Sequence, residues 1–398
     1  MSEMLSTDAA LARLLGAARA VEETVAVPCE AALGRVLAQE LVSAVDVPPL
    51  DNAAMDGYAL RAADWREGEW LPVSQRIPAG SLGAPLAPGS AARIFTGAPV
   101  PEGADTVVMQ EDTESGEAGV RILRAPKPGG HVRRRGEDIR IGQAVLVPGT
   151  RLGPAQLGVA ASVGATELTV YRPLRVAVFF TGDEIVMPGQ PLPPGRIYNS
   201  NRAGLLALLE RLGVTVLDLG QVPDRLDATV AVLERAIREA DVVITTGGVS
   251  VGEEDHVKAA VERLGSLHMW KVAMKPGKPL AYGRVGGTDF IGLPGNPVSA
   301  FVVYTLFVRP FLLARMGATH TPPLAFTVPA AFTWGKPGQR REFLRARIED
   351  GRAVLYPNQS SGVLTSLAWA DGLVDVEIGV TVQPGDPVRF LPLGEWLS

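Results

Sequence analysis

Hydrophobic positions in the second half of the chain alternate between unbroken runs and helical spacing. Residues 176–180 (VAVFF) and 242–246 (VVITT) form runs of apolar or β-branched residues, as expected for strands buried on both faces of a sheet. Amphipathic helical patterns follow these and other predicted strands, over residues 201–212, 224–240 and 255–264. This alternation predicts a doubly wound parallel α/β domain over residues 173–318.

The remaining segments show shorter apolar runs and many turns. Residues 1–44 begin with a helix whose apolar positions share one face, and residues 136–172 contain a hairpin-like stretch and another helix. We expect these two segments to pack together as a mixed linker domain. Residues 45–135 alternate short apolar runs with Gly/Pro turns, which predicts an inserted all-β module. The same alternation over residues 319–398 predicts a small C-terminal β barrel.

Charge and cysteine content restrict the classes of partner and site. The 38 basic and 43 acidic side chains give a net charge of −5, which argues against general nucleic-acid binding but allows a local basic pocket. The single cysteine, Cys29, excludes an intramolecular disulfide and a cysteine-rich metal site, and fits a reducing, cytoplasmic environment. The longest apolar stretch, residues 298–308, is shorter than the roughly 20 residues that cross a membrane. We therefore expect neither a nucleic-acid nor a membrane partner.

Four loops follow predicted strands of the α/β region, where open parallel sheets bind their ligands. They contain glycines, which present backbone N–H groups near helix starts, and carboxylates. Gly247 and Gly248 could cradle an oxyanion or could simply make a tight turn. Their loop matches neither a Walker phosphate-binding loop nor a dinucleotide-binding fingerprint. The four loops are residues 181–184, 223–224, 246–255 and 293–297.

A pair of lysines on a stiff turn is a second candidate. Lys275 and Lys278 belong to the sequence KPGKP, and Lys271 lies four residues before the first of them. Ammonium groups on a turn restricted by proline suit a phosphate or another tetrahedral oxyanion. The alternative is an exposed basic turn without a ligand.

Carboxylates and one basic run complete the candidates. Oxygen ligands beside phosphate-binding groups suggest Mg²⁺, although any one carboxylate could instead cap a helix or a turn. Arg133 opens a run of three arginines that is either a solvated face or a phosphate clamp. Four scattered histidines lack metal-ligand spacing, and no motif supports covalent serine or cysteine catalysis. The carboxylates are Asp51, Asp56, Asp138, Glu184, Asp224 and Asp255.

Eight motifs occur in order along the chain: VPP through DNAAMDGYA, RIFTGAPVPEGADTVVMQED, VRRRGEDI, FFTGDEI, GRIYNSN, ITTGGVSVGEED, WKVAMKPGKP and GLPGNPVSA. Together they resemble the MoeA family of molybdopterin molybdenumtransferases. The resemblance implies the last step of molybdenum-cofactor assembly, in which adenylylated molybdopterin and molybdate give molybdenum cofactor and AMP, with Mg²⁺ as the divalent cation. The dithiolene sulfurs of the pterin hold the molybdenum, so a protein with one cysteine can handle it.

The resemblance also implies roles for the residues that match these motifs. The acidic residues needed for activity would be Asp56, Asp138, Glu184, Asp224 and Asp255, of which Glu184, Asp224 and Asp255 would bind the metal. Thr96 and Arg133 would face the cleft from neighbouring modules. The pterin phosphate would be held by Gly247, Gly248 and Ser250. The pocket would be lined by Lys271, Lys275, Lys278, Pro294 and Pro297, and molybdate would be held by the KPGKP lysines, Ser299, Arg340 and Ser361.

The family is usually an elongated homodimer whose cleft is shared between the β module of one subunit and the α/β domain of the other. Molybdopterin adenylyltransferase and apo-molybdoenzymes would be transient partners. Asn199 stands where the family usually has Asp, and residues 320–398 match least, essentially through RREF and QSSG.

Two alternatives compete with this interpretation. The first is a molybdopterin adenylyltransferase, which is similar to the α/β domain alone and usually carries GGTG in its glycine loop. The second is a gephyrin-like scaffold, which adds a second α/β domain and a long linker. The sequence has GGVSVG in the glycine loop and contains neither of those additions. We therefore expect molybdenum insertion rather than adenylylation or scaffolding.

Overall fold

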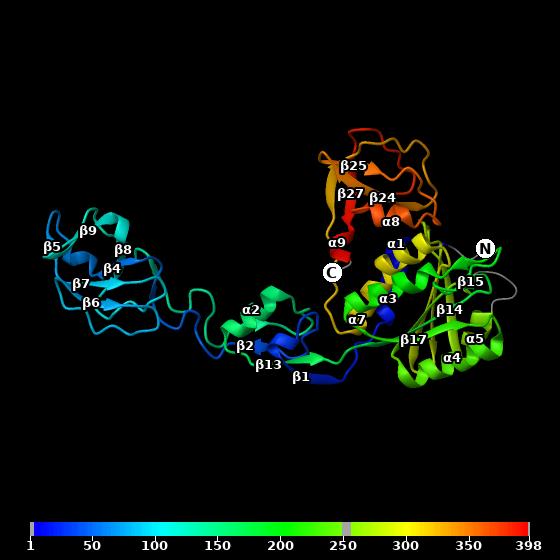
Figure 1. Cartoon of the computed structure of the whole chain (residues 1–398), viewed down its shortest axis with the longest axis horizontal. Helices are drawn as coiled ribbons and strands as arrows, with labels where there is room; N and C mark the ends of the chain where they lie inside the picture. Colours follow the sequence, from blue (N-terminus) through cyan, green and yellow to red (C-terminus); the bar gives the residue numbers. More distant parts are fainter. Residues whose placement is uncertain (1–3, 249–255, 397–398) are drawn as a thin grey trace.

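The molecule is elongated and bent, with a β module at one end and an α/β domain at the other (Figure 1). The structure is a computed structural model and describes residues 4–248 and 256–396. A narrow linker domain lies between the two ends, and a C-terminal β domain lies against the α/β domain. The chain enters the β module and leaves it through the linker domain, so this module is inserted into the linker domain.

A six-stranded sheet forms the centre of the α/β domain. In spatial order its strands are β17 (Thr215–Val222), β14 (Arg175–Thr181), β18 (Val242–Thr246), β22 (Thr288–Leu293), β21 (Pro279–Val285) and β19 (Gly265–Lys271). The first four are parallel, and β21 and β19 extend the sheet as an antiparallel edge. The predicted α/β class is confirmed, and the antiparallel edge is a feature that the sequence pattern did not indicate. A short parallel pair, β15 (Ile185–Val186) and β16 (Ile197–Tyr198), follows β14.

Alternate side chains of β14 face two different layers of helices. Val178 is buried in a cluster with leucines of α3 (Ser200–Leu212). Phe179, on the other face, is buried with residues of α4 (Leu226–Glu239) and α5 (His256–Leu264). Because both faces of the sheet are covered, the strand is apolar at nearly every position.

A long apolar helix over Pro297–Arg315 packs in the same core as α3. It consists of α6 (Pro297–Val303), a π-helical segment η4 (Tyr304–Val308) and α7 (Arg309–Arg315). By length and composition its 19 residues, with a mean hydropathy of 1.6, could cross a membrane, but 67% of its most apolar stretch is buried inside the protein. The apolar run over residues 298–308 is thus part of a longer helix in the core of the domain.

The linker domain is built around the antiparallel pair β1 (Thr24–Pro28) and β13 (Glu167–Tyr171). Helix α2 (Pro154–Ser162) packs on this pair. The first helix, α1 (Thr7–Ala17), lies elsewhere than we expected, because its buried Leu14 belongs to the core of the α/β domain. The domain also contains η1 (Cys29–Ala31), β2 (Leu41–Val42) and β12 (Ala144–Leu146).

The β module contains two sheets. The four-stranded sheet has the order β6 (Val73–Ile77), β7 (Ala91–Ile94), β4 (Gly57–Leu60) and β8 (Thr106–Met109), and the three-stranded sheet the order β5 (Trp70–Leu71), β10 (Gly119–Ile122) and β9 (Thr113–Gly116). A Cβ on Gly57 would lie 1.8 Å from the carbonyl oxygen of Val108, so close strand packing requires this glycine of the DGYA motif. The shorter elements are β3 (Asn52–Ala53), β11 (Val132–Arg133), η2 (Ala62–Asp64) and η3 (Gln110–Asp112).

The C-terminal β domain is a small barrel, as predicted. Its strands are β24 (Arg341–Glu349), β26 (Gly372–Val376), β27 (Pro387–Pro392), β23 (Phe326–Pro329) and β25 (Arg352–Leu355), with short helices α8 (Thr365–Trp369) and α9 (Leu393–Trp396). A bridge between Ala330 and Ala353 closes the ring. Strand β20 (Met274–Lys275) pairs with the start of β24, so backbone pairing joins the barrel to the lysine turn of the α/β domain.

Candidate functional site

A cavity of 530 Å³ lies where loops of the α/β domain meet the barrel. Its walls come from the segments after β18 and β22, the turn between β20 and β21, the first turn of α6 and two barrel segments. Eight residues predicted from the sequence line it. The complete lining is Gly247, Gly248, Lys275, Pro276, Gly277, Lys278, Pro279, Pro294, Gly295, Asn296, Ser299, Arg340, Gln359, Ser360 and Ser361.

Glycines in the left-handed region shape two sides of this cavity. Gly248 has a φ of +62°, and a Cβ there would lie 2.6 Å from Cγ2 of Val257. Gly277, in the lysine turn, has a φ of +101°, and a Cβ there would lie 2.4 Å from Cγ2 of Val303. A residue with a side chain would be strained at both positions. The backbone can therefore approach a ligand closely from both loops.

The cavity carries three cations and, among its described lining residues, no carboxylate. The Lys275 ammonium lies 3.4 Å from Oε1 of Glu342, but the Lys275 side chain is 47% exposed. Arg340 donates from Nη1 to the carbonyl oxygen of Met274 at 3.3 Å. No carboxylate in the part of the chain that the structure describes pairs with Lys278. Cationic donors beside glycine N–H groups suit a tetrahedral oxyanion.

Hydrogen bonds join the loops around the cavity. Ser299 is 5% exposed in the first turn of α6, and the neighbouring Val298 donates its N–H to the carbonyl oxygen of Ser361 at 3.1 Å. Asn201 donates from Nδ2 to the carbonyl oxygen of Gly295 at 2.7 Å. The barrel segment is thus fixed relative to α6, and the segment after β22 is fixed relative to α3, before a ligand binds.

Two predicted carboxylates lie at the carboxyl ends of adjacent parallel strands. Glu184 follows β14 and Asp224 follows β17, and both side chains are exposed. Within the described residues no group of three or more metal-ligating side chains forms. Asp255 and Ser250 lie outside the described residues. Two carboxylates fit Mg²⁺, because this ion commonly takes one or two carboxylates together with phosphate oxygens of the substrate.

Four predicted site residues lie away from the cavity, in the β module or in the segment that returns from it (Figure 1). Oδ1 of Asp56 accepts two hydrogen bonds from Thr96, one from the backbone N–H and one from the hydroxyl, each of 2.7 Å. These bonds hold the pKa of Asp56 below its usual range. Arg133 and Asp138 have exposed side chains. The four residues are not brought to the cavity of the same chain.

Two further predicted residues lie beside the cavity rather than in its lining. Lys271 is the exposed last residue of β19, and its carbonyl oxygen accepts a hydrogen bond from the N–H of Leu5 at 2.9 Å. Pro297 begins α6 and lines a separate apolar notch of 290 Å³, together with Thr246 and Leu293. Neither residue contributes to the charge of the 530 Å³ cavity.

Buried polar groups near the cavity were missed by the sequence analysis. Glu342 is 8% exposed and contacts Lys275 through Oε1, while its Oε2 has no hydrogen-bond partner among the described residues. Arg345 is 1% exposed and lies three residues further along β24. Asn199, which the sequence already singled out, caps α3 by accepting the N–H of Arg202 at 3.0 Å. For Glu342 and Arg345 the sequence did contain a signal, because charged residues occur in this strand at positions that are expected to face the barrel core.

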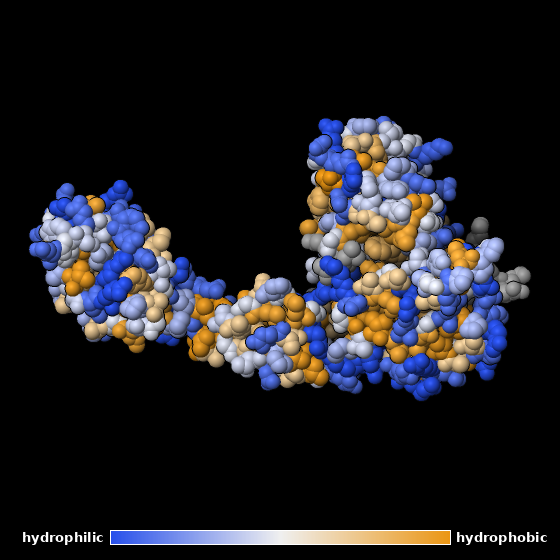
Figure 2. Space-filling model, in the orientation of Figure 1, coloured by the Kyte–Doolittle hydropathy of each residue, from blue (hydrophilic) through white to orange (hydrophobic). Residues whose placement is uncertain are grey.

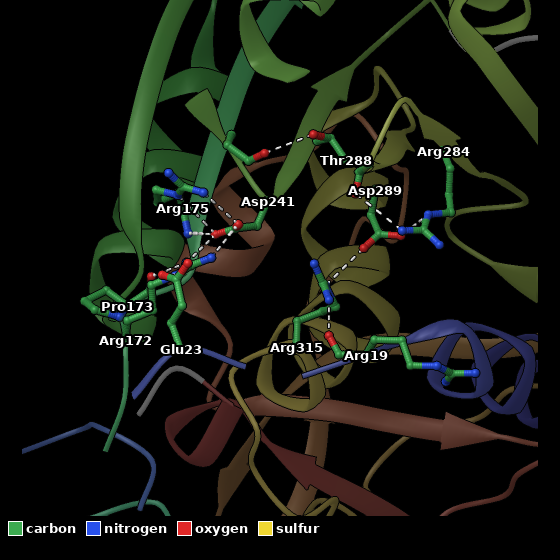
Figure 3. Close-up of polar contacts among 12 residues, drawn as sticks. Arg19, Glu23, Arg172, Pro173, Arg175, Asp241, Arg284, Thr288, Asp289 and Arg315 are labelled. Atoms are coloured by element: carbon green, nitrogen blue, oxygen red, sulfur yellow. Dashed lines mark hydrogen bonds and ion pairs between the residues drawn. The ribbon is translucent and has the colours of Figure 1, made fainter. Parts of the chain in front are cut away.

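The amino ends of the parallel strands carry a different kind of charge (Figure 3). Asp241, just before β18, accepts two hydrogen bonds from the guanidinium of Arg172, at 2.7 and 2.9 Å, and one from the backbone N–H of Arg175 at 2.8 Å. Arg172 also pairs with Glu23 at 2.6 Å. Burial alone would raise the pKa of Asp241, but the bonds from the two arginines outweigh burial and lower this pKa.

A second buried carboxylate lies at the start of β22. Asp289 accepts a hydrogen bond from the hydroxyl of Tyr282 at 2.8 Å. It also pairs with Nε of Arg315 at 3.0 Å (Figure 3). Burial raises the pKa of Asp289, and these partners offset the rise only in part. Arg315 also donates to the carbonyl oxygen of Arg19, so this network ties the segment after α1 to the sheet.

Comparison with protein families covers most of the chain. Residues 5–164 match the MoeA N-terminal region (domain I and II). Residues 177–314 match a family described as "Probable molybdopterin binding domain". Residues 327–393 match the MoeA C-terminal region (domain IV). The three matches follow one another in the order of the linker and β module, the α/β domain and the barrel.

Relatives and solved structures match most of this chain. The molybdopterin molybdenumtransferase of Haemophilus influenzae is 41% identical over 86% of this chain and 85% of its own. Molybdopterin molybdenumtransferase 2 of Mycobacterium tuberculosis is 40% identical over 93% of this chain and 95% of its own. A crystal structure of the molybdopterin biosynthesis MoeA protein of Pyrococcus horikoshii, 28% identical, covers 98% of this chain and 100% of that chain with a TM-score of 0.84. The chain therefore belongs to the MoeA family of molybdopterin molybdenumtransferases.

Proposed function

We propose that this protein inserts molybdenum from molybdate into adenylylated molybdopterin and releases AMP, as a Mg²⁺-dependent transferase of the cytoplasm. The observation that carries the proposal is the 530 Å³ cavity with three cations and no described carboxylate. The names of the relatives support a molybdenumtransferase over an adenylyltransferase or a scaffold. An adenylyltransferase would supply the nucleotide-tagged pterin, and apo-molybdoenzymes would receive the product.

In this proposal the cations hold molybdate. Lys275, Lys278 and Arg340 neutralise the charge of the tetrahedral anion, and the hydroxyls of Ser299 and Ser361 donate hydrogen bonds to its oxygens. Because these groups are positioned before the substrate arrives, little reorganisation is needed when charge develops.

The glycine loop and the carboxylates act on the phosphates of the other substrate. The N–H groups of Gly247 and Gly248 bind the pterin phosphate, as glycine-rich loops do elsewhere. Glu184 and Asp224, with Asp255, would hold Mg²⁺, which supplies positive charge to the phosphoanhydride when bound. The protein's own contribution is to place the anhydride beside the molybdate and to exclude other arrangements.

Reconstitution tests the proposal directly. The purified protein is incubated with adenylylated molybdopterin, Mg²⁺ and molybdate, and AMP release is measured together with activation of an apo-molybdoenzyme. We expect AMP release to require both molybdate and Mg²⁺. Equal AMP release without molybdate would contradict the proposal and would indicate a hydrolase.

We also propose that the active form is a homodimer in which the β module of one copy covers the cavity of the other. The Asp56–Thr96 pair and Arg133 belong to the β module, which lies at the opposite end of the molecule from the cavity (Figure 1). Hydrophobic residues are exposed on the narrow middle part of the molecule (Figure 2), where a second copy would cover them. They include Val42, Val45, Leu50, Ile141 and Val147.

Mixing two inactive variants tests the shared cleft. Asp56→Ala and Lys278→Ala would each be inactive alone, because each site would lack one contribution. Co-expressed, they would form mixed dimers in which one of the two clefts carries neither substitution. We expect about a quarter of wild-type activity, since half of the dimers are mixed and each has one intact cleft. No recovery in dimers confirmed by light scattering would contradict the shared cleft.

A further inference from the structure

Arg345 is a buried cation immediately behind the barrel wall of the cavity. Its side chain donates three hydrogen bonds, all to uncharged acceptors: Nε to the hydroxyl of Ser366 at 3.1 Å, Nη1 to the carbonyl oxygen of Phe343 at 3.2 Å and Nη2 to the carbonyl oxygen of Ser360 at 3.3 Å. Burial lowers the pKa of Arg345 to about 10, so the group is still charged at neutral pH. Within residues 4–248 and 256–396, no carboxylate forms an ion pair with it.

Two other partly buried arginines of this protein have counterions. Arg172 is paired with Asp241, and Arg341, on the same strand as Arg345, is paired with Asp375 at 2.6 Å. Burying a charge without a partner of opposite sign is costly, and proteins rarely do so without a function for the charge. Arg345 thus differs from its neighbours in having hydrogen bonds but no counterion.

The groups that Arg345 holds belong to the cavity. Ser360 lines it, as do Gln359 and Ser361 on either side. The backbone N–H of Arg345 donates to Oε1 of Gln359 at 2.9 Å, and Nε2 of Gln359 donates to the carbonyl oxygen of Arg345 at 2.9 Å. Arg345 therefore contacts this segment both through its backbone and through its guanidinium.

We propose that Arg345 is a positioning residue for the oxyanion site, which fixes the segment from Gln359 to Ser361 and places behind it a positive charge whose counterion is the bound oxyanion. This inference rests on the proposed function and extends it to a residue that does not line the cavity. It also gives the barrel, and not only the α/β domain, a part in oxyanion binding. An uncharged side chain of similar length could fill the space but could neither hold the carbonyl of Ser360 nor attract an anion.

The test measures binding of sodium molybdate to the purified full chain by calorimetry, with thermal unfolding recorded for every variant. Arg345→Met removes the charge and keeps most of the volume, and Arg345→Lys restores a charge without the planar donors. Arg347→Met is the matched control, because Arg347 lies on the same strand, pairs with Glu349 and lies over the ring of Trp369 at 4.5 Å. In turnover, the KM for molybdate is compared with kcat.

We expect Arg345→Met to raise the Kd for molybdate about tenfold, Arg345→Lys to raise it about threefold, and Arg347→Met to leave it unchanged. The KM for molybdate rises with the Kd, while kcat changes little. Wild-type affinity in folded Arg345→Met would overturn the inference. If that variant does not fold, Arg345→Lys and Ser366→Ala replace it, and wild-type affinity in both overturns the inference equally. A wild-type protein that binds no molybdate would instead overturn the proposed function on which the inference rests.

Discussion

Charged side chains have different surroundings at the amino ends and at the carboxyl ends of the parallel strands. At the amino ends, Asp241 and Asp289 are buried and each is paired with an arginine (Figure 3). At the carboxyl ends, Glu184 and Asp224 are exposed, and no described carboxylate pairs with Lys278. The same sheet therefore carries ion pairs along one edge and exposed charges along the other.

This difference separates stability from function within one domain. The paired carboxylates connect the linker segment and the long helix to the sheet. Their charges are neutralised by arginines of the protein itself. Among the described residues, no ion pair neutralises the charges of Lys278, Glu184 and Asp224. Substitutions at the amino ends should therefore change the free energy of unfolding, and substitutions at the carboxyl ends should change ligand binding.

The largest effect is expected on stability, when an ion pair at the amino ends of the strands is removed. Asp241→Ala leaves Arg172 partly buried without its main counterion, and we expect the free energy of unfolding to fall by about 3–5 kcal/mol. Urea denaturation measures this change. Molybdate affinity below the unfolding transition should stay at the wild-type value. Asp227→Ala, which removes an exposed partner of Arg225, is the control and should leave stability unchanged.

The next largest effect is expected at the carboxyl ends of the strands. Lys278→Ala removes a cavity cation without a protein partner, so we expect AMP release to fall about 100-fold while the melting temperature stays constant. Lys336→Ala, an exposed lysine outside the lining, is the control for the change in net charge. Full activity of Lys278→Ala would show that the exposed charges are not used for the reaction.

Acid titration should distinguish the two buried carboxylates at the amino ends of the strands. The pKa of Asp241 is lowered in the folded protein, so its stabilising contribution is present above the unfolded value of about 4 and is lost as the pH falls further. The pKa of Asp289 is raised, so protonation of Asp289 favours the folded state as the pH falls. We expect Asp241→Asn to flatten the loss of stability below about pH 4 by 1–2 kcal/mol. A steeper loss in that variant would contradict the assigned direction.

The smallest effect on ligand binding is expected at Glu342, which pairs with a lysine of the cavity. Glu342 contacts Lys275 and adds a negative charge near the cavity. Glu342→Gln keeps the shape and removes that charge, so we expect molybdate to bind about two- to fivefold more tightly. Calorimetry measures the change, and weaker binding would mean that Glu342 is needed to orient Lys275.

Much of the fold could be predicted from the sequence because it depends on local patterns. The runs VAVFF and VVITT are apolar since both faces of their strands are covered by helices. The position of α1 could not be predicted, because its apolar face specifies a buried partner but not which one. The antiparallel edge of β21 and β19 depends on pairing between distant segments, which hydrophobic spacing does not encode.

The candidate site was predictable where a motif supplies both backbone shape and charge. The lysine turn and Gly247-Gly248 share one cavity, together with Ser299, Arg340 and Ser361. Thr96 is expected to face a cleft shared between two subunits, and within one chain it is bonded to Asp56 at the far end of the molecule from the cavity. Arg345 was missed because a charged residue in a barrel strand looks exposed until its burial is known.

The central claim is that one oxyanion binds among the lysine turn, the first turn of α6 and the barrel segment. A crystal of the protein soaked in tungstate, whose anomalous scattering locates the metal directly, tests this claim. We predict one strong anomalous peak among Lys278, Ser299 and Ser361, with the tungstate oxygens within hydrogen-bond distance of these residues, and this peak is absent in Lys278→Ala crystals. A peak only outside this cavity, or a peak in the cavity that the substitution does not weaken, would contradict the claim.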